Sequence, residues 1–305
     1  MKKTKFKSGS RLSRLQGYFF VLPAMLFMAA LVFYPIIYNI YISFTDMSVK
    51  TLRGGYTFVG LENYKQLLSD SLFLQIIGQT YLFTFLNLIL QFFIGFILAS
   101  FLYRRFPGSG IIRSAMAIPF MVPLSVVSML FKNMLQTNTT DGVINYLLSS
   151  IGLVSPDSPV GWLIDPTSSM WAIVITNCWG GIPFIMMLLI TGFSSISPDV
   201  LESASIDGAT GFKRYWYVIL PLLKSSIFSV LTLGFIYTFK VFDIVYIMTK
   251  GGPANSTHLL STIAYRYSFE EFRFSLGSTA AVVLFFCIML IGIFYLFLIR
   301  NEEAS

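Results

Sequence analysis

The chain has 305 residues, of which 55% are hydrophobic and only 11% are charged, with a formal net charge of +7. Soluble domains carry about 25% charged residues, so this composition excludes an ordinary soluble protein and indicates a membrane protein. The two cysteines, Cys178 and Cys287, lie in apolar runs, and the single histidine, His258, is expected on a loop surface. A disulfide framework, a metal site and Ser-His-Asp catalysis are therefore not expected.

Six stretches are apolar enough to cross a bilayer, which takes about 20 residues for about 30 Å of hydrocarbon. Four of them contain no Asp, Glu, Lys or Arg, namely 15–45, 71–103, 166–198 and 274–299. Residues 114–131 form a shorter span, and 225–248 form one that carries Lys240 and Asp243. The pattern predicts an all-α polytopic membrane protein with six transmembrane helices, at about 17–45, 75–103, 110–132, 168–196, 222–248 and 275–299.

Basic residues gather on one side of this predicted topology. Segments 1–14, 104–113, 195–224 and 300–305 carry 6, 3, 3 and 1 of the 21 Lys and Arg. Positively charged flanks remain in the cytoplasm, so we expect a multi-pass protein of the bacterial plasma (inner) membrane with both termini cytoplasmic. The +7 charge is then a topology signal, and no nucleic-acid partner is expected.

The domain organisation follows from the same pattern. We expect a basic cytoplasmic segment over 1–16, a transmembrane domain over 17–299 and a cytoplasmic tail over 300–305. The first apolar run has no small-residue cleavage site at the usual distance, which favours a retained helix over a removed signal peptide. The outer loops, about 46–74, 133–167 and 249–273, are too short for a separate domain.

The fourth predicted span carries polar and small residues at membrane depth. Such groups usually face a cavity or a partner, and Gly180, Gly181 and Pro183 weaken the helix ladder enough to open backbone toward a cavity. Asn177 can donate and accept hydrogen bonds, and the Trp179 ring offers a flat apolar face on which a ligand can stack. We expect Asn177, Trp179 and Gly181 on a substrate pathway, although the glycines are equally explained by close helix packing.

The cytoplasmic segment after this span resembles a short helix–turn–helix. Ser197 and Pro198 are typical of a helix start, and acids in the first turn face the positive end of the helix dipole. Gly208 stands where a helix ends with a left-handed residue. A second short helix is expected from about 210 to Pro221. The alternative is an ordinary solvated loop.

The fifth span offers further polar candidates for the pathway. These are Tyr237, Thr238, Lys240 and Asp243. Lys240 and Asp243 are three residues apart, on one helix face, so they are alternatively a structural pair near the outer interface.

Several separated motifs together resemble the sugar-type inner-membrane permeases of binding-protein-dependent ABC importers, the maltose and glycerol-phosphate permease group. The family pattern of the cytoplasmic loop, Glu-Ala-Ala, three residues, Gly, nine residues, Ile-x-Leu-Pro, is approached by Glu202, Ala204, Gly208, Ile219, Leu220 and Pro221, with Ser203 in place of the middle Ala. Similar family segments are Gly60-Leu61-Glu62-Asn63-Tyr64, Asp141-Gly142-Val143-Ile144-Asn145 with Leu147, Phe239–Asp243, and Met248–Pro253 with Thr257. The resemblance spans roughly residues 17–299.

The resemblance implies the type I ABC importer permease fold, in which this loop is the coupling helix that docks on an ATPase subunit. Glu202, Ser203, Ala204, Asp207 and Gly208 would form that contact. The implied partners are two ATP-binding ATPase subunits, a second homologous permease, an extracellular solute-binding protein and a sugar, moved by alternating access through the lipid bilayer.

The chain has no GxxxxGK[ST] phosphate loop, so we expect a non-catalytic subunit without cofactors, with ATP and Mg bound by the ATPase partners. Few charges lie at membrane depth, which favours a sugar over an ion as the substrate. A self-sufficient secondary carrier for a neutral solute is the alternative, but it would need an internal repeat and buried titratable groups, and neither is evident. A membrane enzyme lacks clustered His, Asp or Glu at that depth.

Overall fold

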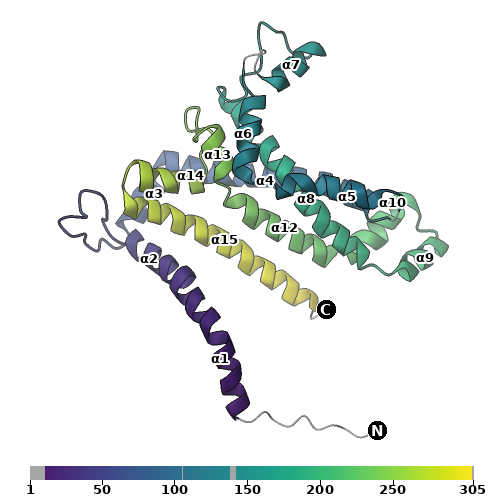
Figure 1. The fold of residues 1–305 in the computed structure, drawn as a ribbon, viewed down its shortest axis with the longest axis horizontal. Helices are drawn as coiled ribbons and strands as arrows, with labels where there is room; N and C mark the ends of the chain where they lie inside the picture. The colour runs from purple at the N-terminus through teal and green to yellow at the C-terminus, as the bar shows by residue number, and fades with distance from the viewer. Residues whose placement is uncertain (1–10, 105, 138–141, 304–305) are drawn as a thin grey trace.

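The computed structural model describes residues 11–104, 106–137 and 142–303, and this part of the chain is helical (Figure 1). Its elements, with η for π-helical turns, are α1 (Arg11–Met28), η1 (Ala29–Phe33), α2 (Tyr34–Ser43), α3 (Glu62–Ser69), α4 (Ser71–Leu102), α5 (Ser109–Met121), α6 (Leu124–Met134), α7 (Val143–Ser150), α8 (Pro166–Ser194), α9 (Pro198–Ile206), α10 (Gly211–Arg214), η2 (Tyr215–Ile219), α11 (Leu220–Leu222), α12 (Lys224–Phe239), α13 (Asp243–Met248), α14 (Leu260–Tyr265), η3 (Arg266–Glu270) and α15 (Phe274–Glu303). The predicted all-α fold is confirmed.

Five stretches of the described chain are long and apolar enough to cross a membrane as helices. They are Phe19–Ser43, Ser71–Leu102, Pro166–Ser194, Lys224–Met248 and Phe274–Phe297. The sixth predicted span is present as the pair α5 and α6, whose axes differ by 90°. The sixth span is therefore present, but the prediction of one continuous helix over about 110–132 is wrong.

The bend between α5 and α6 has a local cause in the sequence. Pro123 has no backbone N–H and disfavours helical backbone at the residue before it. Val122 accordingly adopts extended backbone, with φ −79° and ψ 131°, and α6 begins directly after Pro123.

The fifth span is also interrupted, which the sequence pattern did not predict. Helix α12 ends at Phe239 and α13 begins at Asp243, and the residues between them are not helical. The Ser261 hydroxyl donates to the backbone carbonyl of Val241, which lies in this break. Because Lys240 lies in this break and Asp243 is the first residue of α13, the predicted placement of both on one helix face is wrong.

The core lies where α4 and α8 pack along each other, with α12 packed against both. One cluster of buried side chains joins these helices near α9 and includes Ala99, Leu102, Phe193, Ile219 and Leu223. Helix α1 stands apart from this bundle (Figure 1), and every side chain from Phe19 to Tyr38 is exposed. The chain's own packing therefore does not cover this first span.

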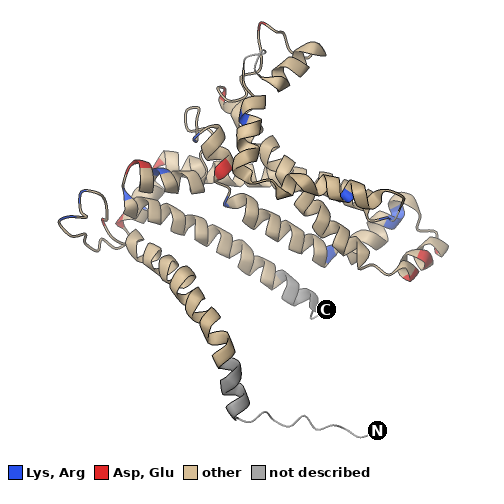
Figure 2. Ribbon diagram, in the orientation of Figure 1, with Lys and Arg blue, Asp and Glu red and all other residues tan. Residues whose placement is uncertain are grey.

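Charged residues concentrate toward the two ends of the bundle, and few lie along its middle (Figure 2). One end carries α9, α10 and the loop between α4 and α5. The other carries α3, α6, α7, α13 and α14. Of the predicted segment 1–16, residues 1–10 lie outside the described residues, as do 304–305 of the predicted tail. Helix α15 continues to Glu303.

Candidate functional site

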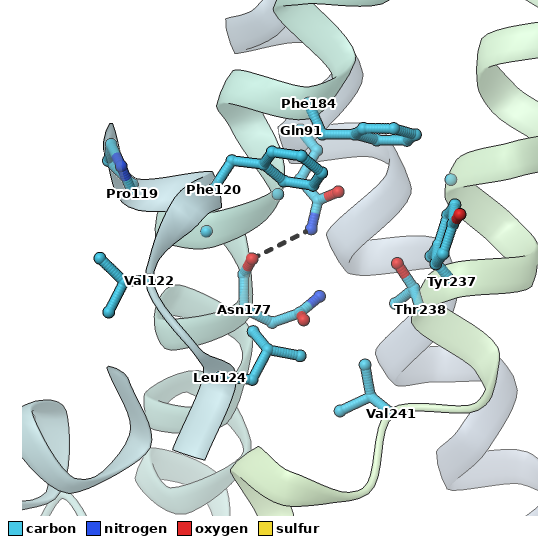
Figure 3. Close-up of a pocket in the computed structure, with 13 residues that line it drawn as sticks. Gln91, Pro119, Phe120, Val122, Leu124, Asn177, Phe184, Tyr237, Thr238 and Val241 are labelled. Carbon is cyan, nitrogen blue, oxygen red and sulfur yellow. Dashed lines mark hydrogen bonds between the residues drawn. The ribbon is translucent and has the colours of Figure 1, made fainter. Parts of the chain in front are cut away.

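A cavity of about 150 Å³ lies between α4, α8, α12 and the bend that separates α5 from α6 (Figure 3). Its wall consists of Gln91, Pro119, Phe120, Val122, Leu124, Asn177, Gly180, Gly181, Phe184, Gly234, Tyr237, Thr238 and Val241. None of these residues is charged, so the cavity offers amides, hydroxyls and aromatic rings. We refer to it as the central cavity.

Asn177 is held in the central cavity by a polar contact between α4 and α8. Its Nδ2 donates to Oδ1 of Asn87 over 2.8 Å, and Gln91 Nε2 donates to the Asn177 backbone carbonyl over 3.4 Å. Asn177 is only 6% exposed. Within the described chain, no hydrogen bond uses Oδ1 of Asn177. One helix–helix hydrogen bond thus orients the amide and leaves an acceptor for a ligand.

Gly181 lies directly against the side-chain amide of Gln91. A β-carbon added at position 181 would lie 2.5 Å from the Gln91 Cδ and Nε2 atoms, so any side chain there would have to displace the Gln91 amide. The two readings of this glycine are therefore compatible, because Gly181 both lines the cavity and permits a close approach of α4.

Tyr237 and Thr238 reach the cavity from α12. Thr238 is buried, whereas Tyr237 is 55% exposed. The Tyr237 ring meets Phe184 edge-on at a centroid distance of 5.3 Å, and Phe184 stacks on Phe120 at 5.2 Å. Figure 3 shows these rings beside the Asn177 and Thr238 side chains. The cavity therefore pairs a polar side with an aromatic side.

Three of the predicted pathway residues do not line the central cavity. Trp179 points instead toward Phe131, with ring centroids 5.8 Å apart. Lys240 Nζ lies 5.2 Å from the ring centroid of Tyr237. No ion pair within the described chain joins Lys240 to Asp243, so the predicted pair is absent from this conformation.

Gln91 lines the polar side of the cavity and Asn87 holds the Asn177 amide, but neither was among the predicted residues. Both are buried and lie four residues apart on α4. The signal was available, because two amides one turn apart in an uncharged 33-residue apolar run are as costly in lipid as Asn177.

At one end of the bundle, α9 has defined caps at both ends. The Ser197 hydroxyl accepts from the Asp199 backbone N–H at the start of the helix. At its end, Gly208 N–H donates to Ser205 O over 3.2 Å and Ala209 N–H donates to Ala204 O over 2.8 Å. Gly208 has φ +82°, so the helix closes with a Schellman motif. The predicted helix start and left-handed end are confirmed.

One face of α9 packs on the bundle and the other is exposed. Leu201, Ala204 and Ser205 are partly buried, as their spacing predicts, and Leu201 contacts the buried cluster at the ends of α4 and α8. Glu202, Ser203, Ile206 and Asp207 are exposed, Ile206 to 82%. The chain then continues through α10, η2 and α11 into α12. Helix α9 is therefore fixed to the bundle by one face and leaves the opposite face exposed.

Two asparagines of the family-like motifs fasten the loops at the opposite end. Asn63 Nδ2 donates to the carbonyls of Ser43 (2.9 Å) and Thr45 (2.7 Å). Asn145 is fully buried, donates to three backbone carbonyls, and accepts from Val160 N–H and Trp162 Nε1 over 3.2 Å each. These motif residues therefore hold the connections between spans.

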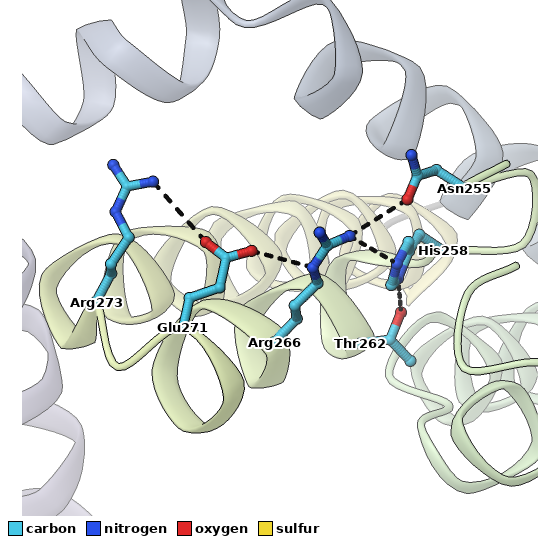
Figure 4. A network of polar contacts seen from close by, with 6 residues as sticks. All are labelled: Asn255, His258, Thr262, Arg266, Glu271 and Arg273. Carbon is cyan, nitrogen blue, oxygen red and sulfur yellow. Dashed lines mark hydrogen bonds and ion pairs between the residues drawn. The ribbon is translucent and has the colours of Figure 1, made fainter.

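His258 is buried and takes part in a polar network at this same end (Figure 4), so its predicted surface position is wrong. It is 4% exposed. Arg266 Nη1 faces His258 Nε2 at 3.5 Å and donates to Asn255 Oδ1 at 3.3 Å, and Arg266 Nε pairs with Glu271 at 3.0 Å. Since Arg266 has only donors, His258 Nε2 accepts, and its Nδ1–H donates to Thr262 Oγ1 at 3.1 Å. Burial and the Arg266 charge lower the pKa of His258 to about 4.

Residues 91–301 match the family described as binding-protein-dependent transport system inner membrane component. The chain belongs to this family. The trehalose/maltose transport system permease protein MalF of Thermococcus litoralis is 34% identical over 281 residues, which is 92% of each chain. The trehalose transport system permease protein SugA of Mycobacterium tuberculosis is 30% identical, over 95% of this chain and 91% of its own. The resemblance stated from the motifs is confirmed.

Solved structures support the fold of this permease. A chain of a bacterial ABC transporter involved in the import of the acidic polysaccharide alginate superposes with a TM-score of 0.80 at 21% identity, covering 95% of this chain and 96% of that one. The permease therefore has the type I ABC importer fold. Its family match begins at Gln91 and extends past α12, so it includes both the central cavity and α9.

Proposed function

We propose that this permease forms half of the sugar pathway of an ABC importer, with the central cavity as its substrate contact and α9 as its coupling helix. The observation that carries the proposal is the placement of Asn177, Gly181, Tyr237 and Thr238 around one uncharged cavity in the middle of the membrane-spanning bundle. The substrate would arrive from an extracellular binding protein and leave to the cytoplasm by alternating access.

The chemistry of the cavity suits a neutral polyhydroxy compound. Sugars present hydroxyls to amide and hydroxyl groups and apolar faces to aromatic rings, and the cavity offers both kinds of surface on facing sides. An ionic substrate would need a compensating charge in a low-dielectric site, and the wall contains none. The sugar transport named for the MalF and SugA relatives supports the same substrate class.

The small volume of the cavity supports the expectation that a second permease subunit completes the substrate site. Small-molecule sites usually enclose about 300–1,000 Å³, whereas this chain alone encloses about 150 Å³. Tyr237 lines the cavity, yet 55% of it remains exposed in this single chain. A homologous permease facing this side would complete the wall and cover that ring.

Two ATPase subunits would supply the energy, one of them docking on α9. Glu202, Ser203 and Asp207 form its exposed face, while Leu201 anchors the opposite face to the buried ends of α4 and α8. A displacement of α9 would therefore be transmitted to the helices that line the cavity. The ATP and Mg would belong to the ATPase subunits, and this chain would be non-catalytic.

The end that carries α9 would face the cytoplasm, together with both termini. Arg104 follows the end of α4, Arg113 lies in the first turns of α5, and Lys213 and Arg214 belong to α10, as expected for cytoplasmic flanks of the spans.

Uptake by the reconstituted transporter tests the pathway. The complex, with its ATPase subunits and binding protein, would be placed in liposomes with radiolabelled trehalose or maltose. We expect Asn177→Leu and Thr238→Val to lower uptake at least tenfold. The control is Thr191→Val, which alters an exposed hydroxyl of α8 that donates to Met187 O. Normal uptake by both cavity variants would refute the pathway.

A second experiment tests the coupling role separately. Glu202→Arg would leave the permease in the membrane but prevent recovery of the ATPase subunits with it and abolish uptake. Substrate-pathway variants would still co-purify with those subunits. Normal uptake by Glu202→Arg would refute the assignment of α9, whatever the cavity variants do.

A further inference from the structure

A second hollow lies on the outside of the bundle, near the end that carries α9. It has a volume of about 500 Å³ and runs between α4 and the stretch from α10 to α11. Phe92, Phe96 and Ile97 line it from α4, and Phe212, Tyr215 and Trp216 line it from the other side. Ser100, also at its wall, donates its hydroxyl to Ile97 O over 2.8 Å. We refer to this hollow as the aromatic groove.

The aromatic groove runs along the axis of α4, which is also the direction that an acyl chain takes across a bilayer leaflet. From Phe92 to Ser100, α4 advances by about 12 Å at 1.5 Å per residue, in the last turns before its end at Leu102. Phe212 and Trp216 stack at 6.1 Å and are 79% and 58% exposed. Tyr and Trp gather at the level of lipid headgroups. The groove therefore begins at the interface and extends into the bilayer.

Three cationic residues, Arg104, Lys213 and Arg214, lie in or next to the two segments that form the walls of the groove. The Arg104 guanidinium lies over the Tyr103 ring, 5.9 Å from its centroid. Tyr103 and Tyr215 raise the pKa of Arg104, and Tyr215 is itself a wall residue. Lys213 and Arg214 lie between the wall residues Phe212 and Tyr215, and the Nε of Arg214 is buried without a hydrogen-bond partner. Within the described residues, no ion pair joins these three cations to a carboxylate.

We propose that the aromatic groove binds one anionic phospholipid of the cytoplasmic leaflet. An acyl chain lies along α4, and the phosphate lies among Arg104, Lys213 and Arg214. An acyl chain makes no hydrogen bonds, so it fits a wall whose one aliphatic hydroxyl is already used, whereas a peptide segment would leave its backbone groups unpaired there. Basic clusters at the membrane surface favour acidic headgroups.

The bound lipid occupies a position next to the coupling machinery. One wall of the groove is α4, which contributes Gln91 to the central cavity, and the other directly follows α9 in the chain. The lipid would brace these two segments against each other. The assignment to the cytoplasmic leaflet rests on the proposed orientation, but lipid retention depends only on the groove and the headgroup.

Native mass spectrometry of the assembled transporter tests the proposal. The complex would be exchanged into detergent with equal amounts of phosphatidylglycerol and phosphatidylcholine. We expect preferential retention of phosphatidylglycerol, reduced at least fivefold by the double variant Arg104→Gln/Lys213→Gln. The matched control is Lys50→Gln/Arg53→Gln, which removes two exposed cations at the opposite end and leaves retention unchanged.

A second pair of variants probes the groove itself. Ser100→Trp fills it while keeping all three cations and should lower retention as strongly, whereas Ser100→Ala should not. Equal retention of the two lipids, or unchanged retention in both the charge variant and Ser100→Trp, would overturn the proposal. So would a photoreactive residue introduced at Trp216 that crosslinks to a protein subunit and not to lipid.

Discussion

The His258 ring lies against the α-carbon of Gly251 so closely that a β-carbon at position 251 would lie 2.1 Å from His258 Cε1. Gly251 also has φ +86°. The glycine thus satisfies two demands at once, left-handed backbone and the absence of a side chain.

We predict that Gly251→Ala destabilises the permease by about 2–4 kcal/mol, because strained backbone and overpacking add. Gly55→Ala is a matched control, since Gly55 has φ +87° but nothing within 4 Å of its β-position. It should cost only about 1–2 kcal/mol. Thermal unfolding of the two variants in detergent measures the difference, and equal midpoints would mean that the His258 contact contributes nothing.

The stability of the end of the bundle that carries α14 should depend on pH through His258. The pKa of His258 is about 4 in the folded chain, below the ordinary 6.5. Between these two pH values the histidine is protonated in the unfolded chain and neutral in the folded chain. Stability is complete above pH 6.5 and falls as the pH drops from 6.5 toward 4. We expect His258→Gln to flatten this dependence between pH 7.5 and 5, measured as the shift in melting temperature. An unchanged shift would contradict the prediction.

Gly181→Ala should lower sugar uptake by displacing Gln91 from the cavity wall. The neighbouring Gly180→Ala is the control, since its β-carbon would lie 3.8 Å from Leu124 Cδ2, an ordinary contact. We expect at least a fivefold loss in the first variant and less than twofold in the second. If the clash with Gln91 is the cause, Gly181→Ala should also lower the melting temperature of the permease, and adding Gln91→Ala should reverse that shift.

The end of α9 should tolerate asparagine but not a branched side chain. Gly208 has φ +82° and open space around it, so its requirement is conformational and not steric. Asparagine adopts left-handed backbone readily, whereas valine does not. We predict near-normal coupling of ATP hydrolysis to uptake in Gly208→Asn and a large loss in Gly208→Val. Equal coupling in both would show that the Schellman end is dispensable.

Most of the spans were predictable because lipid imposes a simple rule, the exclusion of charge over about 20 residues. The caps of α9 were predictable for a similar reason, since Ser197 and Gly208 act through local backbone geometry. The burial of His258 was not, because it depends on Gly251 and Arg266 across a loop. Nor was the break after Phe239, where the partner of the Val241 carbonyl is Ser261, twenty residues later.

The central cavity was half predictable for the same physical reason. The residues of α8 and α12 stood out as polar groups in apolar runs, and the structure brings Asn177 and Thr238 to one wall. Asn87 was equally polar, but its hydrogen bond to Asn177 joins residues 90 positions apart. A pattern read along one helix does not show which neighbouring helix completes it.

The 90° corner at Pro123 has a consequence for the surrounding membrane. Helix α5 has 13 residues and rises by about 20 Å, against about 30 Å of hydrocarbon. This creates a local hydrophobic mismatch of about 10 Å on one flank of the molecule. Either the bilayer thins at that flank, or a neighbouring subunit covers the hydrocarbon that α5 is too short to span. The bend at Pro123 is therefore the place where the isolated permease matches the bilayer thickness least well.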